Sequence, residues 1–578
     1  MPLIEFGDFS GGATPDIYGH KQKPNAASVL RNYRSWRSAL TKIGGQQVVI
    51  DPMPLTDPTL LDFWRFPFSQ ETAYFISAKG GHVWKTSPNG TSAEITGTPN
   101  PYVNQTNNVD PTNYPIGAPL TDTVVWTSTQ LFGGLTYVLS NPDSTPQFVT
   151  TSPQISPAGQ LQDLPGWLWN TPGDPNPYVA RSAAIVRAFD NQLWAGNIIM
   201  KRQDGTLEYY PNLILYSDKS TNPANTYQNY IPDTWQPSSG TSGTASNWAG
   251  FSSLNTSDPI VDMLPLRDTL LVFTTNRTYV VPKLSAPQAS LSPQIISTVR
   301  GLLSNDCACS YDGNVVMLTT DDIVITTGAS IDFQSLANLK VKDRLFQTLL
   351  TRNSDWQKNS YVRYNRYYNE IWVVFPSIYS PDGKCDYGLI WDVESQSWSE
   401  TEMAPHYSLV YAPVIGDGGR NTDRNWIRNT FNLSYNRFQY QYQNQLLAQD
   451  VGYSRPWQVT PDYTTEYVKI VDLEDFGAQA DKIKMLSQVF FFINGGEFVA
   501  GSGLLEMTVK VVFSNIPFAY GIDWDNPDYV GTFTVVEDYK LDLQRPGRYV
   551  ALQFTTNDTL YHELTSFDIN VEIMGRRG

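Results

Sequence analysis

Two apolar runs joined by a turn decide the fold of this chain: Tyr364-Asn-Arg-Tyr-Tyr-Asn-Glu-Ile-Trp-Val-Val-Phe-Pro376 and Tyr387-Gly-Leu-Ile-Trp-Asp-Val-Glu-Ser-Gln-Ser-Trp398. Every residue from Ile371 to Phe375 is apolar, so both faces of that strand are expected to be covered. The sequence Pro381-Asp-Gly383 predicts a turn between the two strands. Residues 361–400 are therefore expected to form one antiparallel β unit.

Similar units precede this one. The chain has 578 residues, more than one core usually organises, with 13% aromatic and 17% charged residues, 40 Gly and 39 Pro. This composition is typical of an all-β protein with many turns. Such strands could also form two packed sheets or a closed barrel. A recurring unit covered on both faces favours a β-propeller of about six blades over residues 46–414, with long loops near 98–120 and 218–250.

The two ends of the chain differ from this repeat. Residues 1–45 are predicted to be an N-terminal arm whose basic cluster docks on a neighbouring subunit or adaptor. Leucine spacing predicts one amphipathic helix within 335–350. Residues 415–460 are a polar connecting segment, and alternation in 461–578 predicts a C-terminal β-sandwich. The basic cluster comprises Lys21, Lys23, Arg31, Arg34, Arg37 and Lys42.

The charge balance argues against a protein that grips nucleic acid. The net charge is −16, whereas sequence-specific DNA or RNA binding usually needs an excess of Lys and Arg. The start of the chain lacks the features of a secretory signal, so folding in a cytoplasm is expected. The longest apolar runs fall far short of the ~18 residues of a membrane helix, so this chain is not expected to insert into a membrane.

The polar motifs give no enzyme signature, and we expect no catalytic, cofactor-binding or metal-binding residues. Asp321-Asp322 is predicted to be a turn, because adjacent residues point to opposite sides. The segment 523–528 resembles the start of a calcium loop but lacks the required Gly and Glu, which favours a surface turn. Cys307, Cys309 and Cys385 are expected to be small hydrophobic residues, since the four His residues are scattered singly.

Aromatic residues mix with arginine in the segment from Tyr361 to Tyr368. Such a mixture can stack on bases or sugars, but cross-strand pairs look the same in a sequence, and we favour packing. Trp372, Trp391 and Trp398 are likewise predicted to form the apolar faces between adjacent units.

Short motifs in three regions of the chain resemble one family of viral proteins. These motifs are Phe9-Ser-Gly-Gly12, Asn25-Ala-Ala-Ser-Val-Leu-Arg-Asn32, Leu40-Thr-Lys-Ile-Gly-Gly45, Leu270-Leu-Val-Phe-Thr-Thr-Asn-Arg-Thr-Tyr-Val280, Arg545-Pro-Gly-Arg-Tyr-Val550 and Phe567-Asp-Ile-Asn-Val-Glu-Ile-Met-Gly-Arg-Arg577. The family is the tail nozzle of short-tailed phages (podoviruses), also called tail tubular protein B, with the related tail hub and stabilisation proteins. The loops at 98–120 and 218–250 have no counterpart in this resemblance.

The resemblance implies a structural virion protein without enzymatic activity. Propeller-bearing subunits would form a hexameric nozzle below the portal-adaptor, through which double-stranded DNA leaves during ejection. The implied partners are further copies of the chain, the tail adaptor, tail fibre or spike proteins, and DNA without sequence specificity. Assembly in the bacterial host cytoplasm and residence in the virion tail are implied as well.

Two alternatives stay open beside this resemblance. One is a carbohydrate-binding or glycan-cleaving β-propeller, because carboxylates from different blades can meet at one mouth. The other is an intracellular interaction scaffold. If the acidic residues of a nozzle face its lumen, they are expected to repel the DNA backbone.

Overall fold

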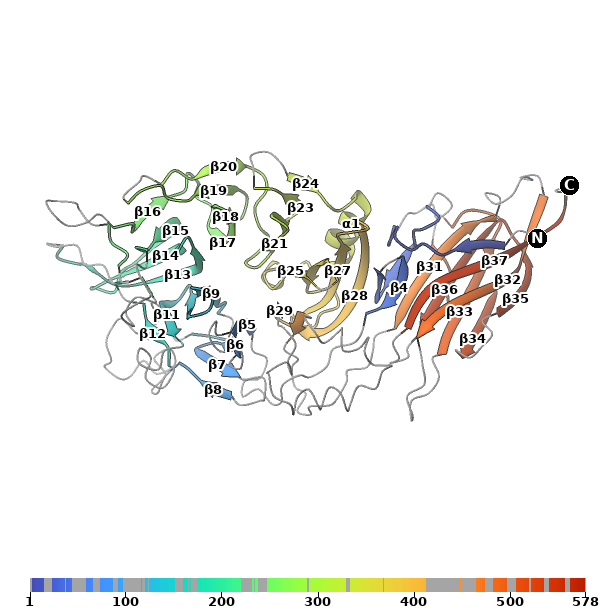
Figure 1. The fold of residues 1–578 in the computed structure, drawn as a ribbon, viewed down its shortest axis with the longest axis horizontal. Helices are drawn as coiled ribbons and strands as arrows, with labels where there is room; N and C mark the ends of the chain where they lie inside the picture. Colours follow the sequence, from blue (N-terminus) through green and yellow to red (C-terminus); the bar gives the residue numbers. More distant parts are fainter. Residues whose placement is uncertain are drawn as a thin grey trace.

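The computed structural model shows a nearly all-β chain arranged in two bodies, and it confirms the prediction of an all-β chain built from repeated sheets (Figure 1). The structure describes residues 3–14, 23–36, 38–43, 59–65, 73–86, 92–96, 116, 120–122, 124–150, 160–164, 166–167, 174–219, 231–232, 234–237, 247–287, 291–328, 333–366, 368–411, 446–448, 464–473, 482–495, 506–518, 521–534, 540–556 and 562–576. Most of the predicted loop 98–120 and of the connecting segment 415–460 therefore lies outside the described residues, as does part of 218–250.

The first body contains six consecutive antiparallel units of four strands each. Units 1 to 3 comprise β5 (Thr59–Arg65), β6 (Ala73–Lys79), β7 (His82–Thr86), β8 (Ser92–Glu94); β9 (Thr127–Leu131), β10 (Thr136–Asn141), β11 (Ser144–Thr150), β12 (Gln162–Asp163); and β13 (Tyr178–Phe189), β14 (Gln192–Arg202), β15 (Leu207–Tyr216), β16 (Gly250–Ser253). Units 4 to 6 comprise β17 (Ile260–Leu266), β18 (Thr269–Thr274), β19 (Thr278–Pro282), β20 (Gln294–Ser297); β21 (Ala308–Tyr311), β22 (Asn314–Leu318), β23 (Ile323–Thr326), β24 (Phe333–Ser335); and β25 (Tyr361–Asn365), β26 (Glu370–Phe375), β27 (Cys385–Asp392), β28 (Ser397–His406).

Local sequence explains how these units form. All six residues of β26 are buried, as the apolar run from Ile371 to Phe375 predicts. Between β13 and β14, Asp190 and Asn191 have φ angles of 51° and 61°. Two consecutive positive φ angles make a tight hairpin whose twist matches the strands, and Asp and Asn tolerate that conformation better than most residues.

Apolar side chains hold each unit against the next. Separate buried clusters join unit 1 to unit 2, unit 2 to unit 3, and unit 3 to unit 4, and a larger cluster runs from unit 4 to unit 6. Trp391 and Trp398 lie in the larger cluster, which confirms their predicted role between units. The same prediction is wrong for Trp372, which packs in a cluster with Ile43 and residues of its own unit.

The first strand of each unit lies toward a common centre (Figure 1). β5 lies beside β9, β9 beside β13, β13 beside β17, β17 beside β21, and β21 beside β25. β29 (Leu409–Tyr411), which pairs with β30 (Leu446–Ala448), lies beside both β25 and β5. The chain beyond unit 6 therefore returns to unit 1.

A short helical segment lies between units 5 and 6. It consists of α1 (Leu339–Asp343), a π-helix η5 (Arg344–Leu349) and, further on, α2 (Ser354–Gln357). The predicted amphipathic helix within 335–350 is confirmed in part: Leu345 and Leu349 are buried, but Leu339 is 72% exposed and the second half of the segment is a π-helix. None of the helices in the described ranges is long and apolar enough to cross a membrane.

The second body consists of two sheets that face each other across one apolar core. One sheet contains β1 (Leu3–Phe6), β3 (Tyr33–Trp36), β4 (Ala39–Lys42), β37 (His562–Arg576), β32 (Lys482–Gly495) and β35 (Lys540–Pro546). The other contains β2 (Val29–Arg31), β31 (Thr465–Asp472), β36 (Tyr549–Thr556), β33 (Glu506–Ser514) and β34 (Tyr529–Thr534). We call this body the two-sheet domain.

The N-terminal residues correct one predicted boundary. The described parts of residues 1–45 do not form a separate arm, because β1 and β4 pair with β37 and β2 pairs with β31. Leu30, Tyr33 and Leu40 are buried in the core of the two-sheet domain. The sequence pattern missed this because the partner strands lie more than 400 residues away along the chain. β2 also pairs in parallel with β28, so one nine-stranded sheet runs from unit 6 into the two-sheet domain.

Candidate functional site

A cavity of about 1240 Å³ lies where the first strands of the six units meet, and we call it the central cavity. Both signs of charge line it. The acidic residues are Asp62, Asp122, Asp262, Asp306, Asp355 and Asp382. The basic residues are Lys79, Arg187, Lys358, Arg363 and Arg366.

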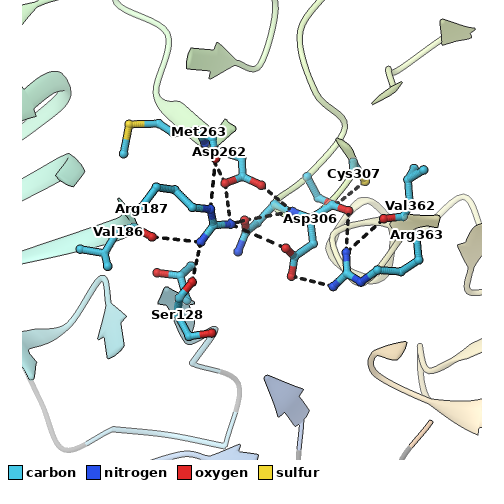
Figure 2. A network of polar contacts seen from close by, with 12 residues as sticks. Ser128, Val186, Arg187, Asp262, Met263, Asp306, Cys307, Val362 and Arg363 are labelled. Carbon is cyan, nitrogen blue, oxygen red and sulfur yellow. Dashed lines mark hydrogen bonds and ion pairs between the residues drawn. The ribbon is translucent and has the colours of Figure 1, made fainter. Parts of the chain in front are cut away.

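Arg187, near the end of β13, is the hub of a polar network at this cavity (Figure 2). Its Nη2 donates to Oδ1 of Asp262 at 2.7 Å, and its Nε donates to the carbonyl of Met263 at 3.1 Å. Its Nη1 donates to the carbonyl of Ser128 at 3.2 Å. One guanidinium therefore ties unit 3 to units 2 and 4.

Asp306 extends the network to units 5 and 6. Its carboxylate oxygens lie 3.7 Å from Nη2 of Arg187 and 3.3 Å from Nη2 of Arg363 on β25. Its backbone N–H donates to Oδ2 of Asp262 at 3.1 Å, and its carbonyl accepts from the N–H of Val362 at 2.9 Å. Asp306 has a φ of 62°, a left-handed conformation that Asp adopts more readily than most residues.

The two carboxyl groups of this network have pKa values shifted in opposite directions. Burial raises the pKa of Asp262, against the opposing effect of Arg187. For Asp306, burial acts to raise the pKa, but the guanidinium groups of Arg363 and Arg187 outweigh it and the pKa is lowered. The side chain of Asp306 is 46% exposed, which is consistent with a carboxylate that stays ionised.

Carboxyls with opposite pKa shifts are the electrostatic pattern of an acid and base pair. Here, however, both oxygens of Asp262 accept protein hydrogen bonds, Oδ1 from Arg187 and Met263 and Oδ2 from Asp306. Of these two carboxyl groups, Asp306 is the half-exposed one beside the cavity. The network thus serves first to hold units 2 to 6 together.

A second network joins unit 6 to the two-sheet domain. Nε of Arg34 on β3 lies 2.9 Å from a carboxylate oxygen of Glu370 on β26, and both side chains are buried. Arg31 on β2 lies 3.7 Å from Glu402 on β28 and 3.6 Å from Glu466 on β31. These two arginines of the basic cluster bind acids of their own chain. Docking of the segment on a neighbouring subunit stays a prediction.

Asp321 and Asp322 form a structural turn. Nη1 of Arg300 lies 2.8 Å from Asp321, and its Nη2 lies 3.3 Å from Asp322. Nζ of Lys342 lies 2.7 Å from Asp322, whose side chain is 1% exposed. The two carboxylates thus anchor the segment that leads into the helices.

The segment 523–528 also uses its carboxylates within a turn. Asp523 accepts hydrogen bonds from the backbone N–H groups of Asp525 and Asn526, and Asp528 accepts one from the N–H of Phe513. Across the described ranges, no group of three or more His, Cys, Asp or Glu side chains is placed to hold a metal.

The cysteines are unpaired thiols, and Cys307 and Cys385 are buried. Burial raises the pKa of both Cys307 and Cys309 to about 12. Cys309 lines the central cavity but is expected to be a poor nucleophile, because the thiolate is the reactive form.

The histidines lie apart in three structural contacts. His82 contacts Glu94 at 2.8 Å, His562 contacts the hydroxyl of Tyr33 at 2.6 Å, and His406 contacts the hydroxyl of Tyr361. The fourth, His20, lies outside the described residues.

No sequence motif marks Arg187, Asp262 or Asp306. A weak signal exists, because Arg187 and Asp262 interrupt apolar runs in the first strands of their units. A charge at such a position needs a partner. The partner lies 75 residues away, on another unit, so only the tertiary structure identifies it. Arg363, in the aromatic segment interpreted as packing, is an ion-pair partner of Asp306.

Comparisons with known proteins assign no family to this chain. No family model and no curated protein matches it. Among solved structures, the chain is similar to U3-55K and to a chain of the mitotic checkpoint complex, each at 10% identity and a TM-score of 0.34. Each match covers 64% of this chain, with 90% and 89% of the other chains. Similarity at this level carries no argument about function.

Proposed function

We propose that the six units close into a β-propeller and that the protein is a structural subunit of a phage tail nozzle. One observation carries the proposal. The nine-stranded sheet runs without interruption from β25 of unit 6, through β2, to β34 of the two-sheet domain. The propeller and the sandwich are then one rigid subunit rather than two domains on a linker.

Two features support closure of the propeller. β29 lies beside both β25 and β5, next to the first strands of units 6 and 1. The network around Arg187 and Asp306 connects the first strands of units 2 to 6 at the centre. Blades packed face to face around such a centre leave few exposed sheet edges.

Rigidity between the two bodies suits a ring. Six copies close a ring only if each keeps one fixed shape, because a small change in angle accumulates around the symmetry axis. Domain interfaces within a chain are mobile unless they are extensive. Here β2 pairs with strands of both bodies, and the buried contact between Arg34 and Glu370 adds a second connection.

In this proposal the ring attaches below the portal-adaptor, carries tail fibre or spike proteins and conducts double-stranded DNA during ejection. The motifs near both ends of the chain resemble those of tail nozzle proteins, and this resemblance supports the assignment to a nozzle. The net charge of −16 per subunit also suits a wall that DNA must pass without binding.

The oligomeric state of the purified full chain tests the proposal. Negative-stain electron microscopy and mass photometry are expected to show six-membered rings, whose share rises with protein concentration. A strictly monomeric chain at micromolar concentration, with or without the adaptor, would overturn the nozzle assignment. Replacing an acidic cluster that faces the ring lumen with Lys is then expected to slow DNA ejection.

The central cavity favours a second candidate, a carbohydrate-binding propeller. Its lining combines charged side chains with Trp126, Trp356 and Tyr364, the residue types that bind and stack on sugars. A glycan array with the full chain tests this candidate. Saturable binding that Asp306→Asn abolishes would support it, and the absence of binding across the array would remove it.

A further inference from the structure

Arg181 on β13 is a buried cation without a counter-charge. Its residue is 3% exposed, and its Nε and Nη2 have no hydrogen-bond partner anywhere in the described part of the chain. No described carboxylate lies within ion-pair distance of it. Buried charges in proteins are usually paired, since an isolated ion loses its hydration without compensation.

One tryptophan stacks on this arginine, and a second tryptophan packs against the first. The guanidinium lies over the ring of Trp167 at 4.4 Å, and the indole N–H of Trp167 donates to the carbonyl of Arg181 at 2.6 Å. Trp235 meets Trp167 edge to face, with ring centroids 4.7 Å apart. The indole nitrogen of Trp235 is also buried and has no hydrogen-bond partner among the described residues. The unsatisfied groups of this cluster are therefore donors.

Other arginines of the same unit are paired. Arg202, on the neighbouring strand β14, lies 2.7 Å from Glu208 and 3.1 Å from Asp174. Arg187, six residues along β13, lies 2.7 Å from Asp262. The lack of a counter-charge is thus specific to Arg181 and is not a property of this sheet.

We propose that Arg181, whose guanidinium stacks on the ring of Trp167, is a binding site for an oxyanion, namely a carboxylate or phosphate group. The two free nitrogens, Nε and Nη2, lie on one edge of the guanidinium. That edge presents two parallel N–H groups, which match two oxygens of one anionic group in a bidentate pair. The indole N–H of Trp235, which packs against Trp167, is a further hydrogen-bond donor without a partner in the described structure.

The charge state of the site is compatible with this chemistry. Burial lowers the pKa of Arg181 to about 9, so the group is still protonated at neutral pH. A bound anion would raise the pKa of Arg181 again, because a nearby opposite charge favours the ionised form. Binding is therefore expected to weaken as the pH rises above about 9.

Thermal unfolding of the full chain tests the site, with acetate and phosphate as probes and chloride at equal ionic strength as the reference. Anion binding to the folded state raises the melting temperature, and the rise grows with the logarithm of the anion concentration once that concentration exceeds the Kd. The wild type is expected to gain several degrees in millimolar phosphate or acetate. Arg181→Met is expected to lose this gain, and it should melt higher than the wild type in chloride because the unpaired charge is gone.

Matched variants separate binding from general salt effects. Arg202→Met removes a paired arginine of the same unit and should keep the anion-dependent gain. Arg181→Lys keeps a positive charge but lacks the pair of parallel N–H groups, so it should lose most of the anion-dependent rise in melting temperature. This variant still tests the site if Arg181→Met does not fold. Equal gains in the wild type, Arg181→Met and Arg181→Lys would overturn the proposal.

The same assay distinguishes the sources of the anionic group. A carboxylate supplied by a second copy of the chain makes the melting temperature in chloride rise with protein concentration, and Arg181→Met removes that rise. A free small anion instead raises the melting temperature at constant protein concentration. The anion site does not depend on ring formation. A negative result in this assay would therefore leave the nozzle proposal unaffected.

Discussion

The side chains of Arg34 and Glu370 form a buried ion pair at 2.9 Å that joins a strand near the N-terminus to the sixth unit. Replacing Glu370 alone with Met leaves the Arg34 guanidinium buried without its carboxylate. Loss of one partner of such a pair costs about 3–5 kcal/mol of folding free energy. Guanidinium denaturation is expected to show this loss in Glu370→Met. The double variant Arg34→Met with Glu370→Met should recover most of it, and a double variant no better than the single one would contradict the prediction.

The N-terminal strands are predicted to be required for folding. Leu30 is 1% exposed in the core of the two-sheet domain, so Leu30→Ala should cost about 2–5 kcal/mol. Leu3 is 56% exposed, and Leu3→Ala should change stability by less than about 0.5 kcal/mol. Denaturation of the two variants measures the difference. A removable arm would instead tolerate both substitutions equally.

The central network predicts unequal effects of its two buried partners. Arg187→Met leaves Asp262 buried without a counter-charge, at a cost of about 3–5 kcal/mol, whereas Asp262→Asn keeps a hydrogen-bonding isostere and should cost less. Burial already raises the pKa of Asp262, and removal of Arg187 raises it further. A group with a raised folded-state pKa stabilises most at low pH. The deficit of Arg187→Met should therefore shrink on acidification, and a deficit that is constant with pH would contradict this account.

Lys469 is predicted to make stability depend on pH. Its side chain is buried, its Nζ donates to the carbonyls of Lys23 and Ala26, and burial lowers its pKa to about 7. A base with a lowered folded-state pKa is less protonated in the folded state than in the unfolded state. Its contribution is therefore full above the unfolded pKa and is lost as the pH falls toward 7. Relative to Lys469→Met, the wild type should gain about 1.4 kcal/mol per unit between pH 7.5 and 9. A stability difference between the two proteins that does not change over this pH range would contradict the prediction.

The three thiols are predicted to be unreactive in the folded protein. Burial raises the pKa of Cys307 and Cys309 to about 12, which lowers the thiolate fraction at pH 8 by more than about a thousandfold relative to a free cysteine. Iodoacetamide labelling followed by mass spectrometry should detect almost no adduct before unfolding and three adducts in denaturant. Rapid labelling of Cys309 in the folded state would show that the central cavity admits and activates the reagent.

Local pattern is enough to predict much of the fold. The continuous apolar run in β26 and the turn residues Asp190 and Asn191 predict strands and hairpins, because strand burial and turn geometry depend on neighbours in the sequence. The leucine spacing likewise predicts a helix within 335–350, and the structure has helical residues there from 339 to 349. By contrast, Trp372 could not be assigned to the correct face, since its contact with Ile43 joins distant parts of the chain.

The sequence by itself determined the all-β class, the repeated antiparallel unit built around Ile371–Phe375, and the absence of an enzyme motif. Only the tertiary structure decided that β1 to β4 belong to the two-sheet domain, that Arg187, Asp262, Asp306 and Arg363 meet at the centre, and that Arg181 has no counter-charge in the described structure. The physical reason is the distance along the sequence over which each interaction acts. Hydrophobic period and turn chemistry act over a few residues, whereas a buried charge is explained by a partner that the fold brings from another unit.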